Sequence, residues 1–374
     1  MLSPKLSPKM KKKALRLAGT GSVEDLLKFA DAQQCDLSVF VALSGPQGET
    51  LLHRAASQNN VAVVVFLLVN NFVDANVRND QMKSPLHEAA TYGALEATLA
   101  LLEFGACAGS VRTFSWTPLM YAASRGHGEI VKALVGAGAS VEDTNKEGMT
   151  ALYVAGREGA LNCVQYLHEC GADLNVATET LRTPLFCSVM NDHKEVAEYL
   201  VDHGARFACR DSSNATIWHE IAQSNSIRCF EAFVSRGLRV PIGERDVLGR
   251  HPVHIAAAEG NHEILRLMLE NCPGIVDLLD SVGNTALLLA SCRGNHLCAG
   301  HLLQFQCNAA IPDPKGRTPL HLAVGFKQYN VVKLLMTSPD GCDLDATDHA
   351  GVTPRSMAEK AGAMDILKIL TGTS

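Results

Sequence analysis

Apolar residues along the chain occur in pairs of short stretches with helical spacing, separated by polar turns. In residues 117–138, the apolar positions of 118–123 and of 130–135 recur three and four residues apart, as on one face of a helix. Gly126 separates the two stretches and Gly138 follows the second one. The pattern therefore predicts two short helices joined by a tight turn.

The same pattern repeats along most of the chain with a period of 33 to 35 residues. Aligning the segments on one threonine, or on the residue that replaces it, gives ten copies, at Thr50, Ser84, Thr117, Thr150, Thr183, Thr216, His251, Thr285, Thr318 and Thr353. A fixed period of this length is the signature of a repeat architecture. We therefore expect an array of helix pairs that stack on one another.

A short motif opens each copy, and its residues have separate structural roles. Residues 84–89 read SPLHEA, and residues 318–323 read TPLHLA. The hydroxyl residue is a good N-cap for the first helix, and a proline at the first helical position loses no hydrogen bond there. Between copies, an aspartate such as Asp246 favours the start of a turn, and a following glycine suits its left-handed position.

These features resemble the ankyrin repeat, whose 33-residue unit carries the motif T-P-L-H-x-A, a β-turn and two helices. The resemblance covers nearly the whole chain. It implies an all-α solenoid of about eleven helix-turn-helix units with β-hairpin fingers, in a right-angled stack with polar terminal capping repeats. We expect a basic flexible arm over residues 1–13 and a single solenoid over 14–372, with a partial N-terminal cap and a C-terminal cap.

Composition and charge narrow the function classes. The formal net charge is −6, which gives no general attraction to nucleic acid. The longest apolar run, residues 61–69, is too short to span a bilayer. The 12 cysteines include no CxxC pair, which favours reduced thiols over disulfides or a zinc site. We expect a cytoplasmic protein, with a nuclear location as the alternative.

The sequence contains no recognisable catalytic motif. There is no glycine-rich phosphate loop, no His-Glu-x-x-His motif and no nucleophile elbow. Histidines recur at the motif position, where a structural hydrogen bond explains them better than catalysis; they are His53, His87, His219, His254 and His321. We expect no enzymatic activity, no metal, no cofactor and no small-molecule substrate.

For binding, the resemblance implies a concave surface built from finger tips and first helices. Aromatic and arginine residues gather at these positions in the second to fifth units, and such residues often dominate binding energy. The expected partner-binding residues are Tyr92, Phe114, Trp116, Tyr121, Arg125, Met149, Arg157 and Arg182. We therefore expect a non-catalytic scaffold or adaptor that binds a partner protein. The alternative is local packing of these side chains on their own helices.

Two further expectations concern the carboxy-terminal half of the chain. Trp218 occupies the leucine position of its motif, so we expect it in the core. Ile255, Leu289 and Leu322 make the first-helix positions aliphatic, which allows a second contact surface.

Lysines concentrate in the amino-terminal arm, which is consistent with a solvated tail that aids solubility and, as the alternative, with nuclear import or an anionic partner. A nuclear or chromatin-associated regulator that uses this arm is the alternative function. Ser3 and Ser7 each precede Pro-Lys and resemble sites of proline-directed kinases. Asn76 and Asn175 are similar to targets of the asparaginyl hydroxylase that modifies ankyrin hairpins, although asparagine is also a structural preference there.

Overall fold

The structure is a computed structural model that describes residues 7–35, 37–109, 116–338 and 343–371. Within these ranges it contains α-helices, one short 3₁₀ helix at Pro273–Ile275 and no β-strand. Two isolated β-bridges join Ser44 to Thr50 and Arg210 to Thr216. The prediction of an all-α repeat fold is confirmed.

The chain divides into two compact units, residues 1–179 and 180–374. The first unit contains α1 (Pro8–Thr20), α2 (Val23–Ala32), α3 (Leu37–Val41), α4 (Leu51–Ser57), α5 (Val61–Val69), α6 (Pro85–Tyr92), α7 (Leu95–Glu103), α8 (Pro118–Ser124), α9 (Gly128–Gly136), α10 (Ala151–Arg157) and α11 (Leu161–Glu169). The second contains α12 (Pro184–Met190), α13 (Lys194–Asp202), α14 (Ile217–Ser224), α15 (Ile227–Ser235), α16 (Pro252–Glu259), α17 (His262–Asn271), the 3₁₀ helix, α18 (Ala286–Arg293), α19 (His296–Gln304), α20 (Pro319–Gly325), α21 (Tyr329–Thr337), α22 (Pro354–Lys360) and α23 (Met364–Thr371).

All ten alignment residues are the N-caps of first helices, as the motif predicted. The Thr117 hydroxyl, for example, accepts the backbone N–H of Met120 at 3.2 Å. Pro118 follows at the first helical position. Thr117 and Pro118 therefore both favour the start of α8 at this point. In each copy, the residue that recurs with the period of the sequence therefore marks the start of a first helix.

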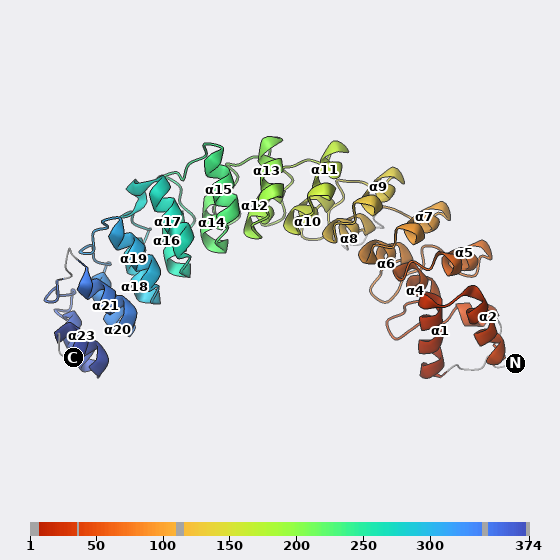
Figure 1. Cartoon of the computed structure of the whole chain (residues 1–374), viewed down its shortest axis with the longest axis horizontal. Helices are drawn as coiled ribbons and strands as arrows, with labels where there is room; N and C mark the ends of the chain where they lie inside the picture. The colour runs from red at the N-terminus through yellow and green to blue at the C-terminus, as the bar shows by residue number, and fades with distance from the viewer. Residues whose placement is uncertain (1–6, 36, 110–115, 339–342, 372–374) are drawn as a thin grey trace. The chain divides into compact units, whose positions relative to one another are not determined.

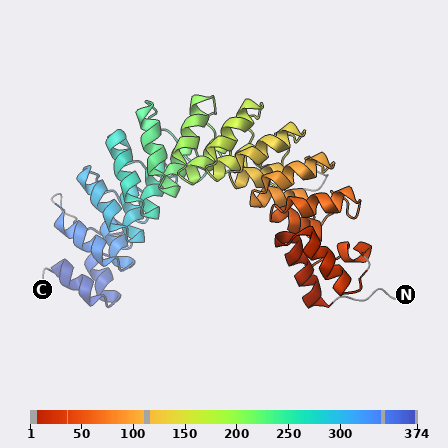
Figure 2. The ribbon, with the colours of Figure 1, turned by 45° about the vertical axis from the view of Figure 1, so that its right-hand side comes forward.

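Within each unit, first helices stack on first helices and second helices on second helices (Figures 1 and 2). In the first unit, α4, α6, α8 and α10 form one row, and α5, α7, α9 and α11 form the other. Leu86, Leu119 and Leu152 of the motif are completely buried between neighbouring pairs. Apolar burial between helix pairs, in place of one central core, is the main stabilising contribution.

Motif histidines tie one copy to the next. The Nδ1 atom of His53 accepts the backbone N–H of Thr50 at 3.2 Å, and Nε2 lies 2.9 Å from the carbonyl oxygen of Lys83, in the following copy. His219 and His321 make the same pair of bonds. Because one nitrogen accepts and the other donates, the neutral ring fits this place, and the structural interpretation of these histidines is confirmed.

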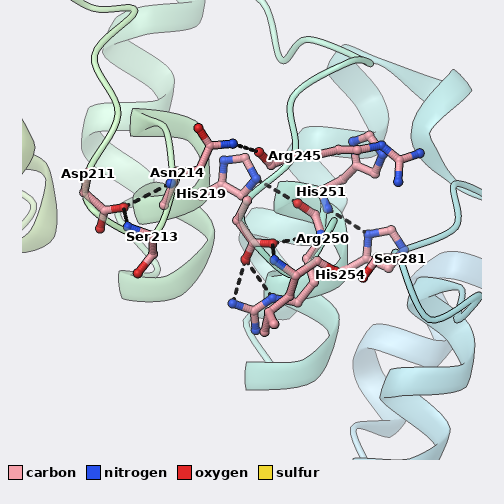
Figure 3. A network of polar contacts seen from close by, with 12 residues as sticks. Asp211, Ser213, Asn214, His219, Arg245, Arg250, His251, His254 and Ser281 are labelled. Atoms are coloured by element: carbon pink, nitrogen blue, oxygen red, sulfur yellow. Dashed lines mark hydrogen bonds and ion pairs between the residues drawn. The ribbon is translucent and has the colours of Figure 1, made fainter.

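The turn segments between copies, which we call fingers, are built on aspartate or asparagine. In the finger 246–250, Oδ1 of Asp246 accepts the backbone N–H groups of Leu248 and Arg250, each at 2.9 Å. Several pairs of successive fingers are joined by a backbone hydrogen bond, as from Asp80 to Gln47 at 3.0 Å. Figure 3 shows such contacts in the second unit, where Asn214 reaches the backbone of Arg245 and His219 reaches Arg250.

The first helix begins earlier than the sequence analysis expected. α1 starts at Pro8, and the Ser7 hydroxyl caps it by accepting the backbone N–H of Met10 at 3.4 Å. Residues 8–13 therefore belong to a helix that packs against α4, and this part of the expected flexible arm is corrected. The physical reason is the Ser-Pro pair, which is itself a cap followed by a first-turn proline. Ser3 lies outside the described residues.

Candidate protein-binding surface

Three of the expected binding residues come together in the first unit. Trp116 precedes α8, and its ring centroid lies 5.3 Å from that of Tyr121, within α8. The guanidinium carbon of Arg157, at the end of α10, lies 5.6 Å from the centroid of the Trp116 ring. Trp116, Tyr121 and Arg157 are each half-buried. The two aromatic rings therefore combine local packing with an accessible face.

Around these side chains the surface forms a depression of about 380 Å³. Its lining residues are Trp116, Tyr121, Ser124, Arg125, Arg157 and Glu158. Arg125 is exposed. Arg157 donates from Nε to Glu158 at 2.9 Å and directs a second nitrogen to the sulfur of Met149 at 3.8 Å. We call Trp116, Tyr121, Arg125, Met149 and Arg157 the aromatic–arginine cluster.

The remaining predicted residues lie elsewhere. Tyr92, at the end of α6, is 63% exposed and lines a smaller hollow of about 180 Å³ with Lys83 and Glu88. Arg182 belongs to the second unit, where it pairs with Asp211 and Glu220, each at 3.4 Å. Phe114 lies outside the described residues.

Lys83 and Glu158 are site residues that the sequence analysis did not select. The ammonium group of Lys83 lies 4.6 Å from the ring centroid of Tyr121, a cation–π distance. Lys83 stands just before its N-cap, at the same position of the repeat as Trp116. This shared position was a usable signal, because residues one period apart are neighbours in the stack.

The second unit differs at the corresponding positions. Ile255 and Leu322 are only 3% and 5% exposed, so they contribute to packing and not to the second contact surface that the sequence allows, whereas Leu289 is half-buried. Their burial follows from the stacking of α16 and α20 between neighbouring first helices. Trp218 is 4% exposed, and its ring makes edge contacts with Phe207, Phe230 and Phe233, which confirms its core position.

Asn76, one of the two expected modification sites, bridges adjacent copies. Its side chain donates to the carbonyl oxygen of Gly105 at 3.2 Å and accepts the backbone N–H of Cys107 at 2.8 Å. In both Asn76 and Asn175 the backbone N–H donates to the aspartate two residues earlier. The two side-chain bonds of Asn76 give a structural reason for asparagine at position 76.

Electrostatics in the described residues favour structural roles for the ionisable groups. Burial raises the pKa of the Cys163 thiol to about 11 and that of Cys298 to about 12, so neither thiol is ionised at neutral pH. Burial lowers the pKa of His53, and burial together with Arg78 and Lys83 lowers that of His87 to about 4. In the described ranges, no helix has the length and apolar character needed to cross a membrane.

Comparison with known proteins agrees with this architecture. The family model described as ankyrin repeats (3 copies) matches residues 14–111, 100–178, 218–311 and 253–348, and a single ankyrin repeat matches 180–212. The chain is 30% identical to mouse inversin over 195 residues, which is 51% of this chain and 18% of inversin. It is 28% identical to the chicken nuclear factor NF-kappa-B p105 subunit over 195 residues, 50% of this chain and 20% of that protein.

A solved structure also shares the fold. The ankyrin repeat domain of Bcl-3, described as a unique member of the IkappaB protein family, aligns with a TM-score of 0.52 and 25% identity, covering 61% of this chain and 100% of that domain. The chain spans about a fifth of the length of the curated relatives above. Ankyrin repeats are in general protein–protein interaction modules. Because the family models match most of its length, the chain belongs to the ankyrin-repeat family.

Proposed function

We propose that this protein is a non-catalytic scaffold or adaptor that binds a partner protein through the aromatic–arginine cluster, on the concave face of its repeats. The observation that carries the proposal is the placement of Trp116, Tyr121 and Arg157 around a depression of about 380 Å³. Trp, Tyr and Arg are the residue types most enriched among binding hot spots.

The local contacts also favour binding over mere packing. Arg157 is oriented before any partner arrives, because Glu158 accepts its Nε–H and the Trp116 ring lies beside its guanidinium group. A side chain that is already ordered loses less conformational entropy on binding. The depression has room for one inserted side chain of a partner, with Arg125 exposed at its edge.

Catalysis has little support among the described residues. In His53 and His219 one ring nitrogen bonds the N-cap of the same copy and the other bonds the backbone of the next copy, so neither nitrogen is left for proton transfer to a substrate. The buried thiols whose pKa is raised are poor nucleophiles.

The test is affinity capture from cell lysate with the full chain, comparing the wild type with Trp116→Ala and Arg157→Ala. Phe326→Ala is the matched control, because Phe326 is an aromatic residue of the second unit that is 53% exposed. A prey protein retained by the wild type and the control but lost from both cluster variants supports the proposal. Identical prey from all four proteins, with unchanged circular dichroism, overturns it.

A further inference from the structure

A second surface feature lies at the opposite end of the first unit from the aromatic–arginine cluster. Between α1, α4 and the finger 44–49 the surface forms a groove of about 880 Å³. Lys11, Lys12 and Arg16 of α1 and Arg54 of α4 line it. We call these four residues and the space between them the basic groove.

The four cations of the basic groove outnumber the carboxylates that line it. None of the four takes part in an ion pair there. Glu49 is the one carboxylate among the lining residues, and it already accepts the backbone N–H of Gln47 at 3.0 Å. The groove therefore carries an excess of positive charge.

Neighbouring helices do not supply the missing anions either. α1 carries no acidic residue. α2 carries three acidic residues: Glu24 pairs with Lys28 at 3.6 Å, Asp25 accepts the backbone N–H of Ser22 at 3.0 Å, and Asp31 lies near the end of the helix. None of the three lines the groove. The positive end of the α1 dipole adds to the potential of the lysines near its start. An anionic ligand would lower the electrostatic free energy of this region.

Apolar groups also line the groove, which restricts the chemistry of that ligand. Pro8, Leu15 and Pro46 contribute apolar walls between the cations. A sugar-phosphate backbone would leave these walls unused, and the chain as a whole carries a net charge of −6. An extended peptide that combines carboxylates with apolar side chains can satisfy both kinds of lining.

We propose that the basic groove binds an acidic segment of a partner protein in which apolar side chains alternate with aspartate and glutamate. The proposal rests on the proposed function in one respect, that the ligand is a protein. It adds a second contact surface with its own partner chemistry, built from α1, α4 and the first finger in place of α8 and α10.

The test uses fluorescence anisotropy with the full chain and a labelled peptide of about twelve residues that alternates glutamate and leucine. The variant Lys11→Glu/Lys12→Glu/Arg16→Glu is expected to weaken binding at least about tenfold, because three unpaired cations become anions. The control Lys146→Glu/Lys315→Glu/Lys333→Glu changes the net charge equally, at exposed positions outside the groove, and is expected to retain binding.

Several outcomes would overturn the proposal. Equal losses in the two triple variants would assign the effect to net charge alone, and no loss in either would exclude the groove. A peptide with serine in place of leucine that binds equally well would remove the role of the apolar walls. Tighter binding of a short DNA duplex than of the peptide would assign the groove to nucleic acid.

The Trp116→Ala variant separates this proposal from the proposed function. It is expected to bind the acidic peptide as the wild type does, because Trp116 does not line the groove. Failure of the capture experiment with normal peptide binding would reject the aromatic–arginine cluster and leave the groove supported. Melting temperatures and circular dichroism of all variants check that each is folded.

Discussion

The two tryptophans of this chain occupy opposite environments in the two units. Trp218 of the second unit is 4% exposed and lies among three phenylalanine rings. Trp116 of the first unit is half-buried beside Tyr121 and Arg157. Trp218 stands two residues after its N-cap Thr216, and Trp116 stands just before its N-cap Thr117.

This difference shows how a repeat separates stability from recognition. A ring at the leucine position enters the stack between neighbouring pairs, where burial dominates its contribution. A ring just before the cap lies on the finger, where cationic side chains of adjacent copies can reach it. Register within the repeat, more than residue type, decides the role of an aromatic side chain.

The largest expected effect is on the free energy of unfolding, and it tests the core position of Trp218. Trp218→Ala should lower the free energy of unfolding by about 3–5 kcal/mol, because it leaves a cavity among Phe207, Phe230 and Phe233. Urea denaturation followed by far-ultraviolet circular dichroism measures this loss. A smaller loss than that of Trp116→Ala would reverse the assignment of core and surface.

Acid sensitivity extends the comparison to the motif histidines of the two units. Burial lowers the pKa of both His87 and His219. The positive charges of Arg78 and Lys83 lower the pKa of His87 further, to about 4. The negative charges of Asp246 and Glu244 act in the opposite direction on the pKa of His219. The unfolded chain binds a proton near pH 6.5 and the folded chain does not. The contribution of His87 to stability should therefore fall as pH drops below about 6.5 and level off near pH 4, and that of His219 should fall in the same direction.

For His87 alone the expected loss between pH 7.5 and pH 5 is about 2 kcal/mol. His87→Gln should flatten the dependence of the denaturation midpoint on pH more than His219→Gln does. A midpoint that rises on acidification in this range, or a larger flattening by His219→Gln, would contradict the assigned environments.

Removing the half-buried tryptophan, Trp116, should have a smaller effect on the free energy of unfolding. Trp116→Ala should cost less than Trp218→Ala, because it loses about 1 kcal/mol from the ring contact with Tyr121 and only the partial burial of its ring. The same variant should weaken partner capture, so that binding and stability separate. If the melting temperature falls as far as in Trp218→Ala, Trp116 is a packing residue and the aromatic–arginine cluster loses its anchor.

The smallest expected effect concerns hydroxylation of the fingers. Incubation with the asparaginyl hydroxylase should add one oxygen to the peptides that carry Asn76 and Asn175, without a measurable change in the melting temperature. Mass spectrometry of both peptides checks this. Absence of the added oxygen from both, with the enzyme active on a control substrate, would leave only the bridging role of Asn76 to Gly105 and Cys107.

Helix starts, caps and core positions could be predicted from the sequence because each depends on residues within one copy. Thr117, Pro118 and Leu119 define their own positions by local hydrogen bonding and periodicity. The start of α1 is hard to predict because Ser7-Pro8 lies in a lysine-rich segment whose composition is typical of a flexible arm. The local cap outweighs the charge repulsion there.

The candidate site was harder to predict because it depends on side-chain directions across copies. Trp116, Tyr121 and Arg157 meet as expected, but the contribution of Lys83 follows from its reach over α8. Arg182 is drawn to Asp211 and Glu220, two carboxylates of the following copy, and their attraction is absent from any single-copy motif. The spacing of apolar residues predicts which face of each helix is buried. The partner of a long, flexible side chain depends on which of several charged groups lies within its reach.

The hydrogen bonds between fingers have a consequence for how the chain acquires its structure. In the second unit, Ser281 donates to Leu248 and Val247 donates to Ser213, so each bond connects segments about one period apart. Chains whose contacts are close in sequence close only short loops and fold quickly. Each newly synthesised pair of helices can therefore add to the pair before it, while the rest of the polypeptide is still on the ribosome.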